Sequence, residues 1–235
     1  FARHLGHHSD ACEYLEVSLR WLGQILASLP ADRSPDELLR QQGFALLHLG
    51  ETIREVDREE ARRCYEQSLA LYRETNYAWG EANALEALGW LIQHWGGYRE
   101  ARHLYRESLA VRQRLGDQRG LANALRAQGG IVLYQGDPQR AQELISESLA
   151  LMEANGDRVG IAACLGKLGE TLIALGDFSA AQERLQAARA QYRELGLSNA
   201  RAFIEAIATL GLLHQGEYER AQRQAEAVLL HFELI

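Results

Sequence analysis

Residues 80–117 read GEANALEALGWLIQHWGGYREARHLYRESLAVRQRLGD, and residues 120–157 follow the same pattern as GLANALRAQGGIVLYQGDPQRAQELISESLALMEANGD. The two stretches begin forty residues apart and place their glycines and several alanines at matching positions. Self-similarity at a fixed period is the sequence signature of a repeat architecture. The chain is therefore expected to fold as a stack of similar units rather than around one central core.

Small residues keep this interval of forty along most of the chain. One series consists of alanines, at Ala61, Ala101, Ala141, Ala181 and Ala221. Two further series consist of glycines, at Gly96, Gly136, Gly176 and Gly216, and at Gly89, Gly129 and Gly169. The tetrapeptide Glu-Ser-Leu-Ala also recurs, at residues 107–110 and 147–150. Chance does not produce this regularity.

Each unit divides into two helices, which we call helix A and helix B. Leu85, Leu88 and Ile92 have the i, i+3, i+7 spacing of one helical face, and helix A is expected to end at the glycines that follow. In later units Asp137 or Asp177 is a predicted N-cap of helix B, with Pro138 at the first helical position. Helix B is expected to turn its own small and apolar residues, Ala101, Tyr105, Ser108 and Leu109, toward the core.

The glycine series at Gly89, Gly129 and Gly169 falls inside helix A, where each glycine costs about 1 kcal/mol relative to alanine. Something must offset this cost. We predict close packing of helix A against helix B, near the alanine of the series that contains Ala101.

The repeat count gives the domain organisation. We predict one array with a partial repeat over residues 1–29, an inserted loop over 30–36, and five repeats over 37–76, 77–116, 117–156, 157–196 and 197–235. The loop accounts for ten extra residues between Ala11 and Ala61, around Ser28 to Asp36. Because the sequence lacks an initiator methionine and its last helix has no polar cap, it is expected to be part of a longer polypeptide.

Composition narrows the function classes. The chain has 25 basic and 32 acidic residues, a formal charge of −7, which disfavours nucleic acid as a partner. It has no run of about 18 apolar residues and no signal peptide, so neither a membrane span nor secretion is expected. Cys12, Cys64 and Cys164 lie far apart without metal-site spacing, which indicates a reducing, cytoplasmic setting.

Candidate catalytic and metal sites are weak. Gly160 to Lys167 superficially resembles a phosphate loop, but Leu168 stands where serine or threonine is required, so this stretch is predicted to be helix. The only histidine cluster is His4, His7 and His8, with Asp10 close by, and inert surface histidines are the commoner explanation. We therefore predict a protein that is not an enzyme, with no metal and no cofactor.

The residue pattern resembles the tetratricopeptide repeat. The residues that carry the resemblance are Leu85, Leu88, Gly89, Ile92, Tyr98, Ala101 and Tyr105, repeated as Leu125, Gly129, Val132, Ala141 and Ile145. The resemblance implies an all-α solenoid of helix-turn-helix repeats that forms a right-handed superhelix. The forty-residue period, longer than the usual 34, is similar to the sensor region of bacterial signal-transducing ATPases with numerous domains. Similar repeats also occur in eukaryotic scaffolds that bind peptides.

A binding surface is expected on helix A, which lines the concave side of such solenoids. The candidate residues lie opposite the buried stripe of each helix A: Asn83, Glu86, Trp90, His94, Asn123, Arg126, Tyr134 and Glu170. Asparagine amides can pair with a peptide backbone, and Trp90 and Tyr134 are candidate aromatic anchors. A solvated or packing face is the alternative for all of them. The other tryptophans, Trp21, Trp79 and Trp95, are expected in the core or between repeats.

Two functions follow from the resemblance. In the first, the array is the sensor of a bacterial signalling ATPase, recognises a protein, peptide or small-molecule inducer on helix A, and contacts other domains of the same polypeptide. In the second, the chain is a peptide-binding scaffold without an attached ATPase. A phosphate-binding loop in the adjoining sequence would favour the first.

Overall fold

The structure, a computed structural model, describes residues 13, 16–17, 19–24, 28 and 35–233, with side chains up to residue 230. Most of the predicted partial repeat over 1–29 and of the inserted loop over 30–36 lies outside these residues. The same is true of Cys12, of the histidine cluster at His4, His7 and His8, and of Asp10.

Every regular element that the structure describes in full is an α-helix, and the described residues contain no strand. The chain divides after Asp117 into two compact units. The first contains α2 (Asp36–Ile53), α3 (Arg58–Glu74), α4 (Ala78–His94) and α5 (Tyr98–Leu115). The second contains α6 (Gln118–Tyr134), α7 (Pro138–Ala154), α8 (Arg158–Leu175), α9 (Phe178–Glu194), α10 (Ser198–His214) and α11 (Tyr218–Glu233).

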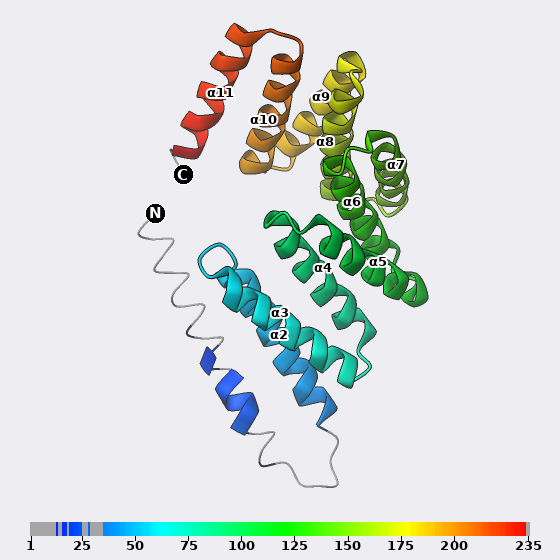
Figure 1. Ribbon diagram of the computed structural model, residues 1–235, viewed down its shortest axis with the longest axis vertical. Helices are drawn as coiled ribbons and strands as arrows, with labels where there is room; N and C mark the ends of the chain where they lie inside the picture. Colours follow the sequence, from blue (N-terminus) through cyan, green and yellow to red (C-terminus); the bar gives the residue numbers. More distant parts are fainter. Residues whose placement is uncertain (1–12, 14–15, 18, 25–27, 29–34, 234–235) are drawn as a thin grey trace. The chain divides into compact units, whose positions relative to one another are not determined.

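Consecutive helices form pairs joined by short turns (Figure 1). Helix A of each pair is α2, α4, α6, α8 or α10, and helix B is the helix that follows. The predicted all-α fold of tandem helix pairs is confirmed. The stretch 160–167 lies within α8, as predicted. The handedness of the superhelix stays a prediction.

The turns repeat every twenty residues. The described residues with positive φ are Asn76, Gly96, Gly116, Gly136, Gly156, Gly176, Gly196 and Gly216. Each follows the end of a helix, where a left-handed residue lets the next N–H reach back to an orphan carbonyl, as the Asp117 N–H does to the Arg112 carbonyl at 3.1 Å. Asn76, with φ 49°, takes the place of glycine because asparagine tolerates this conformation better than other side chains.

Aspartates begin several of the following helices. The Asp137 and Asp177 side chains accept hydrogen bonds from the backbone N–H groups of Arg140 and Ala180, both at 3.1 Å. Pro138 is the first residue of α7. Both predicted caps and the predicted proline position are confirmed.

The interior glycines allow the close packing that their period predicts. A Cβ atom on Gly129 would lie 2.6 Å from the Ile145 side chain and 3.3 Å from the Ala141 carbonyl oxygen, on helix B of the same pair. One on Gly169 would lie 2.5 Å from Leu185, and one on Gly89 would lie 3.3 Å from the Tyr105 ring. Packing of helix B thus offsets the cost of glycine within helix A.

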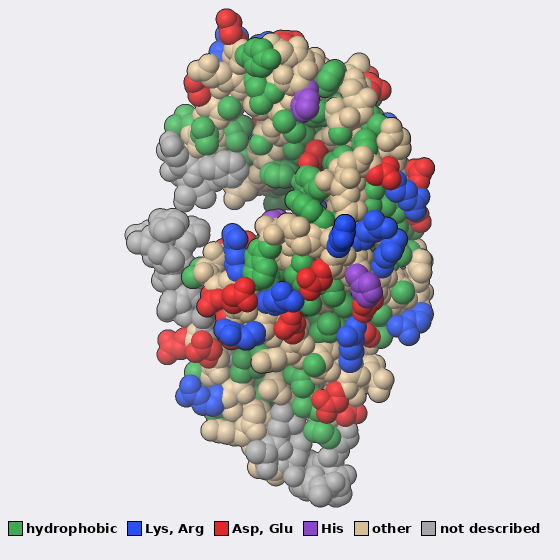
Figure 2. Space-filling view, in the orientation of Figure 1, with side chains coloured by type: hydrophobic (Ala, Val, Ile, Leu, Met, Phe, Trp, Pro, Cys, Tyr) green, Lys and Arg blue, Asp and Glu red, His purple; other side chains and the backbone are tan. Residues whose placement is uncertain are grey.

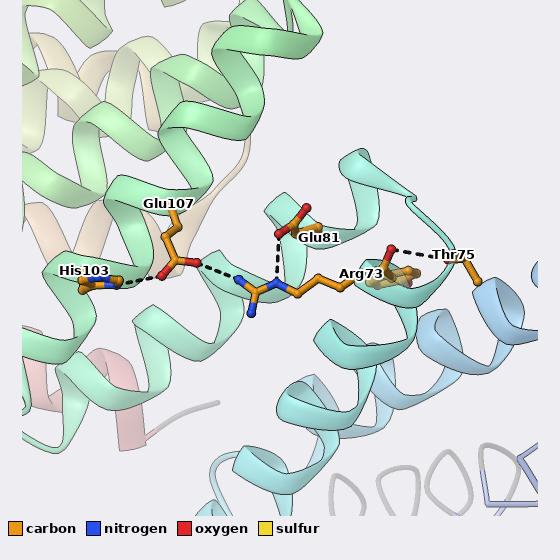
Figure 3. Close-up of polar contacts among 6 residues, drawn as sticks. Arg73, Thr75, Glu81, His103 and Glu107 are labelled. Atoms are coloured by element: carbon orange, nitrogen blue, oxygen red, sulfur yellow. Dashed lines mark hydrogen bonds and ion pairs between the residues drawn. The ribbon is translucent and has the colours of Figure 1, made fainter.

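Consecutive pairs in the first unit are also joined by charged side chains (Figure 3). Arg73 of α3 donates from Nε to Glu81 of α4 at 3.0 Å and from Nη2 to Glu107 of α5 at 2.7 Å. His103 lies 2.7 Å from the other oxygen of Glu107. We call the set Arg73, Glu81 and Glu107 the first junction. Its arginine is compensated by two carboxylates, one from each of the next two helices.

Candidate ligand-binding surface

The polar candidates on α4 are held by a buried arginine of α5. Arg112, whose side chain is only 5% exposed, donates to Asn83 Oδ1 at 2.6 Å, to Glu86 Oε1 at 2.7 Å and to Asp117 Oδ2 at 2.5 Å. Burial by itself would lower the pKa of Arg112, but the bonds to Glu86 and Asp117 outweigh it and raise that pKa above its ordinary value. Ser108 donates a further hydrogen bond to Glu86 at 2.7 Å.

This network changes what the two predicted residues can offer. The Glu86 carboxylate is already neutralised inside the protein, so it is a structural group. The carbonyl oxygen of Asn83 is occupied, but its amide nitrogen has no acceptor among the described residues. Asn83 is thus fixed in one orientation and retains two N–H donors for a ligand.

The aromatic candidate on α4 is packed as well. The guanidinium carbon of Arg54 lies 4.0 Å from the centroid of the Trp90 ring, a cation–π contact. The ring of His94 lies 3.8 Å from that of Trp90, and its Nδ1 lies 2.7 Å from the Trp90 carbonyl oxygen. Trp90 therefore has internal partners and is only partly buried.

Two of the other tryptophans are not where we predicted. Trp21 is 65% exposed and Trp79 is 48% exposed, so neither is core or filler between repeats. Trp79 is the second residue of α4 and contacts the Tyr77 ring at 6.3 Å between centroids. Its position in the first turn of α4, away from the buried stripe, overrides the preference of its side chain for burial. Trp95 is partly buried.

The corresponding face of α6 carries an arginine that lacks a counter-charge. Arg126 is partly buried, and its Nε is buried without a hydrogen-bond partner among the described residues. Burial raises the pKa values of Cys164 on α8 and Tyr192 on α9, whereas the positive charge of Arg126 lowers both. The Arg126 guanidinium therefore lies near these two side chains. No carboxylate of the described residues pairs with it.

The forty-residue register explains the difference between α4 and α6. Arg126 takes the position of Glu86, and Met152 takes the position of Arg112. The acid and the base of the α4 network are thus replaced by a base and an apolar side chain. Asn123, in the position of Asn83, has no hydrogen-bond partner among the described side chains.

The remaining candidates lie on α6 and α8. Lys167 Nζ is 5.4 Å from the centroid of the Tyr134 ring and 2.6 Å from Glu170 Oε2. Tyr134 is 49% exposed, and burial of the rest of its ring raises the pKa of its hydroxyl. Glu170 is therefore neutralised by Lys167, whereas about half of Tyr134 is exposed.

Sequence reasoning missed three exposed apolar residues on α10. Phe203 is 57% exposed, Leu210 42% and Leu213 45%. Phe203 and Leu210 stand three periods after Asn83 and Trp90, so continuing the count of forty would have found them. On the face shown in Figure 2, charged side chains of both signs interleave over the first unit, while hydrophobic and uncharged atoms predominate over α10 and α11.

Other classes of site have little support in the described part of the chain. It contains no group of three or more metal-binding side chains and no helix long and apolar enough to cross a bilayer. Cys64 and Cys164 are buried free thiols, and burial raises the pKa of Cys64 to about 11, which makes it unreactive at neutral pH.

Comparison with known proteins agrees with the helix pairs and their glycine-ended turns. The profile of the tetratricopeptide repeat matches residues 42–114, 92–154 and 120–194. The chain belongs to the tetratricopeptide repeat family. No curated protein shows a significant match along its sequence.

Solved structures share the tetratricopeptide fold at low identity. BtubC (BKLC) from P. vanneervenii is 15% identical, with a TM-score of 0.72 over 94% of this chain and 89% of that one. A Rap protein complexed with competence and sporulation factor is 11% identical, with a TM-score of 0.67 over 99% and 68%.

A Signal Transduction ATPase with Numerous Domains with a tetratricopeptide repeat sensor, from Pyrococcus horikoshii, is 16% identical, with a TM-score of 0.63. The match covers 82% of this chain and 32% of that protein, so this chain spans about a third of its length. At these identities the likeness concerns the fold alone.

Proposed function

We propose that this chain binds a protein or peptide through the exposed face of its A helices, and that an acidic group of the ligand is bound at Arg126. The observation that carries the proposal is a partly buried guanidinium with a buried, unbonded Nε and no carboxylate partner among the described residues. A partly buried cation without an ionic partner is costly, and an incoming carboxylate supplies the missing counter-charge.

The neighbouring groups on α6 suit an extended ligand. Asn123 lies one turn before Arg126 on the same face and offers two N–H donors and one acceptor to a peptide backbone. Tyr134 lies two turns further on, with half of its ring exposed. The three side chains thus follow one face of the helix as a polar contact, a charged contact and an aromatic contact.

The exposed face of α4 offers a ligand less unpaired charge than the face of α6 does. Its carboxylate and arginine neutralise each other through the Glu86–Arg112 pair, at 2.7 Å. Asn83 and Trp90 remain as contacts that discriminate by hydrogen bonding and shape.

Selection of peptides tests this proposal. A random peptide library is panned against the folded chain, and the affinity of selected peptides is measured by fluorescence anisotropy. The selected peptides are expected to carry an acidic side chain or a free terminal carboxylate. Arg126→Gln should weaken binding by about 10- to 100-fold, the range of a lost charge-assisted hydrogen bond. Neutralising that acidic group of the peptide should have a similar effect.

A matched control is Arg140→Gln on α7, because Arg140 is exposed and paired with Glu143 within its own helix. This variant should bind as the wild type does. Selected peptides that lack any acidic group, or that bind Arg126→Gln unchanged, would remove Arg126 from the site.

The sensor of a signalling ATPase is a second proposal, supported by the fold shared with the Pyrococcus horikoshii protein. In such a system, ligand binding shifts an attached nucleotide-binding module between two states, which requires different affinity for each. The natural polypeptide should then contain a phosphate-binding loop, and its nucleotide hydrolysis should respond to the selected peptide in the wild type but not in Arg126→Gln. If the natural polypeptide contains no such loop, the sensor proposal fails and the scaffold function remains.

A further inference from the structure

The second unit contains two adjoining hollows among α8, α9, α10 and α11. Their volumes are about 700 Å³ and about 350 Å³. The linings share Gln186, Arg189, Glu205 and Gln224, so the two hollows meet at a polar wall. Both volumes lie within the range of small-molecule binding sites.

The hollows arise where the repeat exchanges leucines for polar or small residues. Glu205 stands three periods after Leu85, and Ala208 three periods after Leu88, both of which are buried in α4. Arg189 stands two periods after Leu109. Side-chain volume is lost at Ala208, while Glu205 and Arg189 replace apolar side chains with a polar wall.

Hydrogen bonds hold this wall in place. Arg189 of α9 pairs with Glu205 of α10 at 2.9 Å, and Gln224 of α11 donates to the other carboxylate oxygen of Glu205 at 3.0 Å. Gln224 also donates to the Glu205 carbonyl at 3.1 Å. Glu205 and Arg189 therefore compensate each other and leave no net charge at the wall.

The larger hollow carries additional positive charge in its lining. Arg193, Arg201 and Ala227 line it and stand three periods after Arg73, Glu81 and Glu107 of the first junction. We call these three residues the last junction. Where the first junction has one cation and two carboxylates, the last junction has two cations and no carboxylate.

These two arginines stay uncompensated within the described residues. Neither Arg193 nor Arg201 has a carboxylate partner there. Helix α10, which carries Arg201, begins without a side-chain cap and has no acidic residue in its first turn. The positive end of its helix dipole therefore adds to the same charge.

We propose that the larger hollow binds a small organic dianion, with the charged group at Arg193 and Arg201 and an apolar body against Ala190, Ala202 and Val228. A phosphate monoester and a dicarboxylate both satisfy this chemistry. Two guanidinium groups match two negative charges, and guanidinium binds both kinds of oxyanion through parallel N–H donors. The site is independent of Arg126 on α6.

Calorimetric titration with phenyl phosphate and with suberate tests the proposal and distinguishes the two head groups. At least one of them should bind the wild type, and binding should weaken as salt is added. The double variant Arg193→Ala with Arg201→Ala should lose at least 10-fold in affinity. Inorganic phosphate should bind more weakly than phenyl phosphate, because it lacks the apolar body.

Arg201→Glu is a variant expected to keep the fold, since it gives the last junction the same residue types as Arg73 and Glu81. It should unfold at the same or a higher temperature and bind neither anion. Arg184→Ala is the matched control, because this exposed arginine of α9 does not line either hollow. Four results would overturn the proposal. The first two are that the wild type binds neither anion, or that the double variant binds as tightly as the wild type. The other two are that Arg184→Ala loses as much affinity as the double variant, or that inorganic phosphate binds as tightly as phenyl phosphate.

Discussion

The first and last junctions occupy the same places in the repeat and differ in how they are filled. At the first junction Arg73 is neutralised by Glu81 and Glu107, and Leu85 of α4 is fully buried. At the last junction two arginines stand without a carboxylate, and Glu205 replaces that leucine beside a hollow. The glycine-ended turns are the same in both regions. Turns and small residues therefore specify the repeat, whereas the larger residues can differ between repeats and change the local packing and charge.

The largest effect is expected from truncating the core at the better-packed helix α4. Leu85→Ala should lower the free energy of unfolding by about 3 kcal/mol, because it removes a fully buried side chain and leaves a cavity. Glu205→Ala, at the same repeat position, should cost about 1 kcal/mol or less. Urea denaturation followed by circular dichroism measures both. Equal losses would mean that the two pairs are equally well packed.

The glycines that allow close packing give the next largest effect. Gly129→Ala should destabilise the protein by about 1–2 kcal/mol, because its Cβ would lie 2.6 Å from Ile145. The adjacent Gly130→Ala is the matched control, since its Cβ would come no closer than 3.8 Å to Lys167. It should stabilise by up to about 1 kcal/mol through helix propensity. The same sign for both variants would contradict the packing explanation.

These cases show what the sequence could predict. The period of forty specified the helix pairs, the turns and the role of Gly129, because each depends on a single position repeated in every unit. The Arg112 network was missed because it depends on residues 26 and 29 positions apart, Glu86 and Asn83, being paired in space. The only sign of this network in the sequence is that Arg112 stands where the following repeats have Met152 and Tyr192.

The candidate site was predicted less well than the fold. Residue type suggested that Glu86 and Glu170 would be open to ligands, but internal bases neutralise both. A helical face shows which residues point outward and does not show which of them are already paired. The role of Arg126 stays a prediction, and its lack of a partner became visible only in three dimensions.

Filling the smaller hollow should make the last pair more like the others. Ala208→Leu restores the leucine found at Leu88 and should stabilise the protein by about 1 kcal/mol, through burial of added apolar surface. Ala84→Leu is the contrast, because Ala84 is fully buried in a packed region and the larger side chain should destabilise by at least as much. Thermal unfolding of both variants gives the comparison.

The charged residues of the junctions should have the smallest effect on stability. Arg73→Ala removes two partly exposed ion pairs and should cost about 0.5 kcal/mol, less at high salt. Arg193→Ala removes none among the described residues and should change stability by less than about 0.3 kcal/mol. A larger loss in Arg193→Ala would reveal a partner for this arginine.

Hydrogen exchange along the chain tests most directly the claim that repeat positions decide how tightly each pair is packed. Backbone amides of α10 should exchange at least about 10-fold faster than those of α4, a difference of about 1.4 kcal/mol in opening free energy. Ala208→Leu should reduce that difference, which separates the effect of the hollow from other differences between α10 and α4. Equal protection of α10 and α4, or no response to Ala208→Leu, would contradict the account.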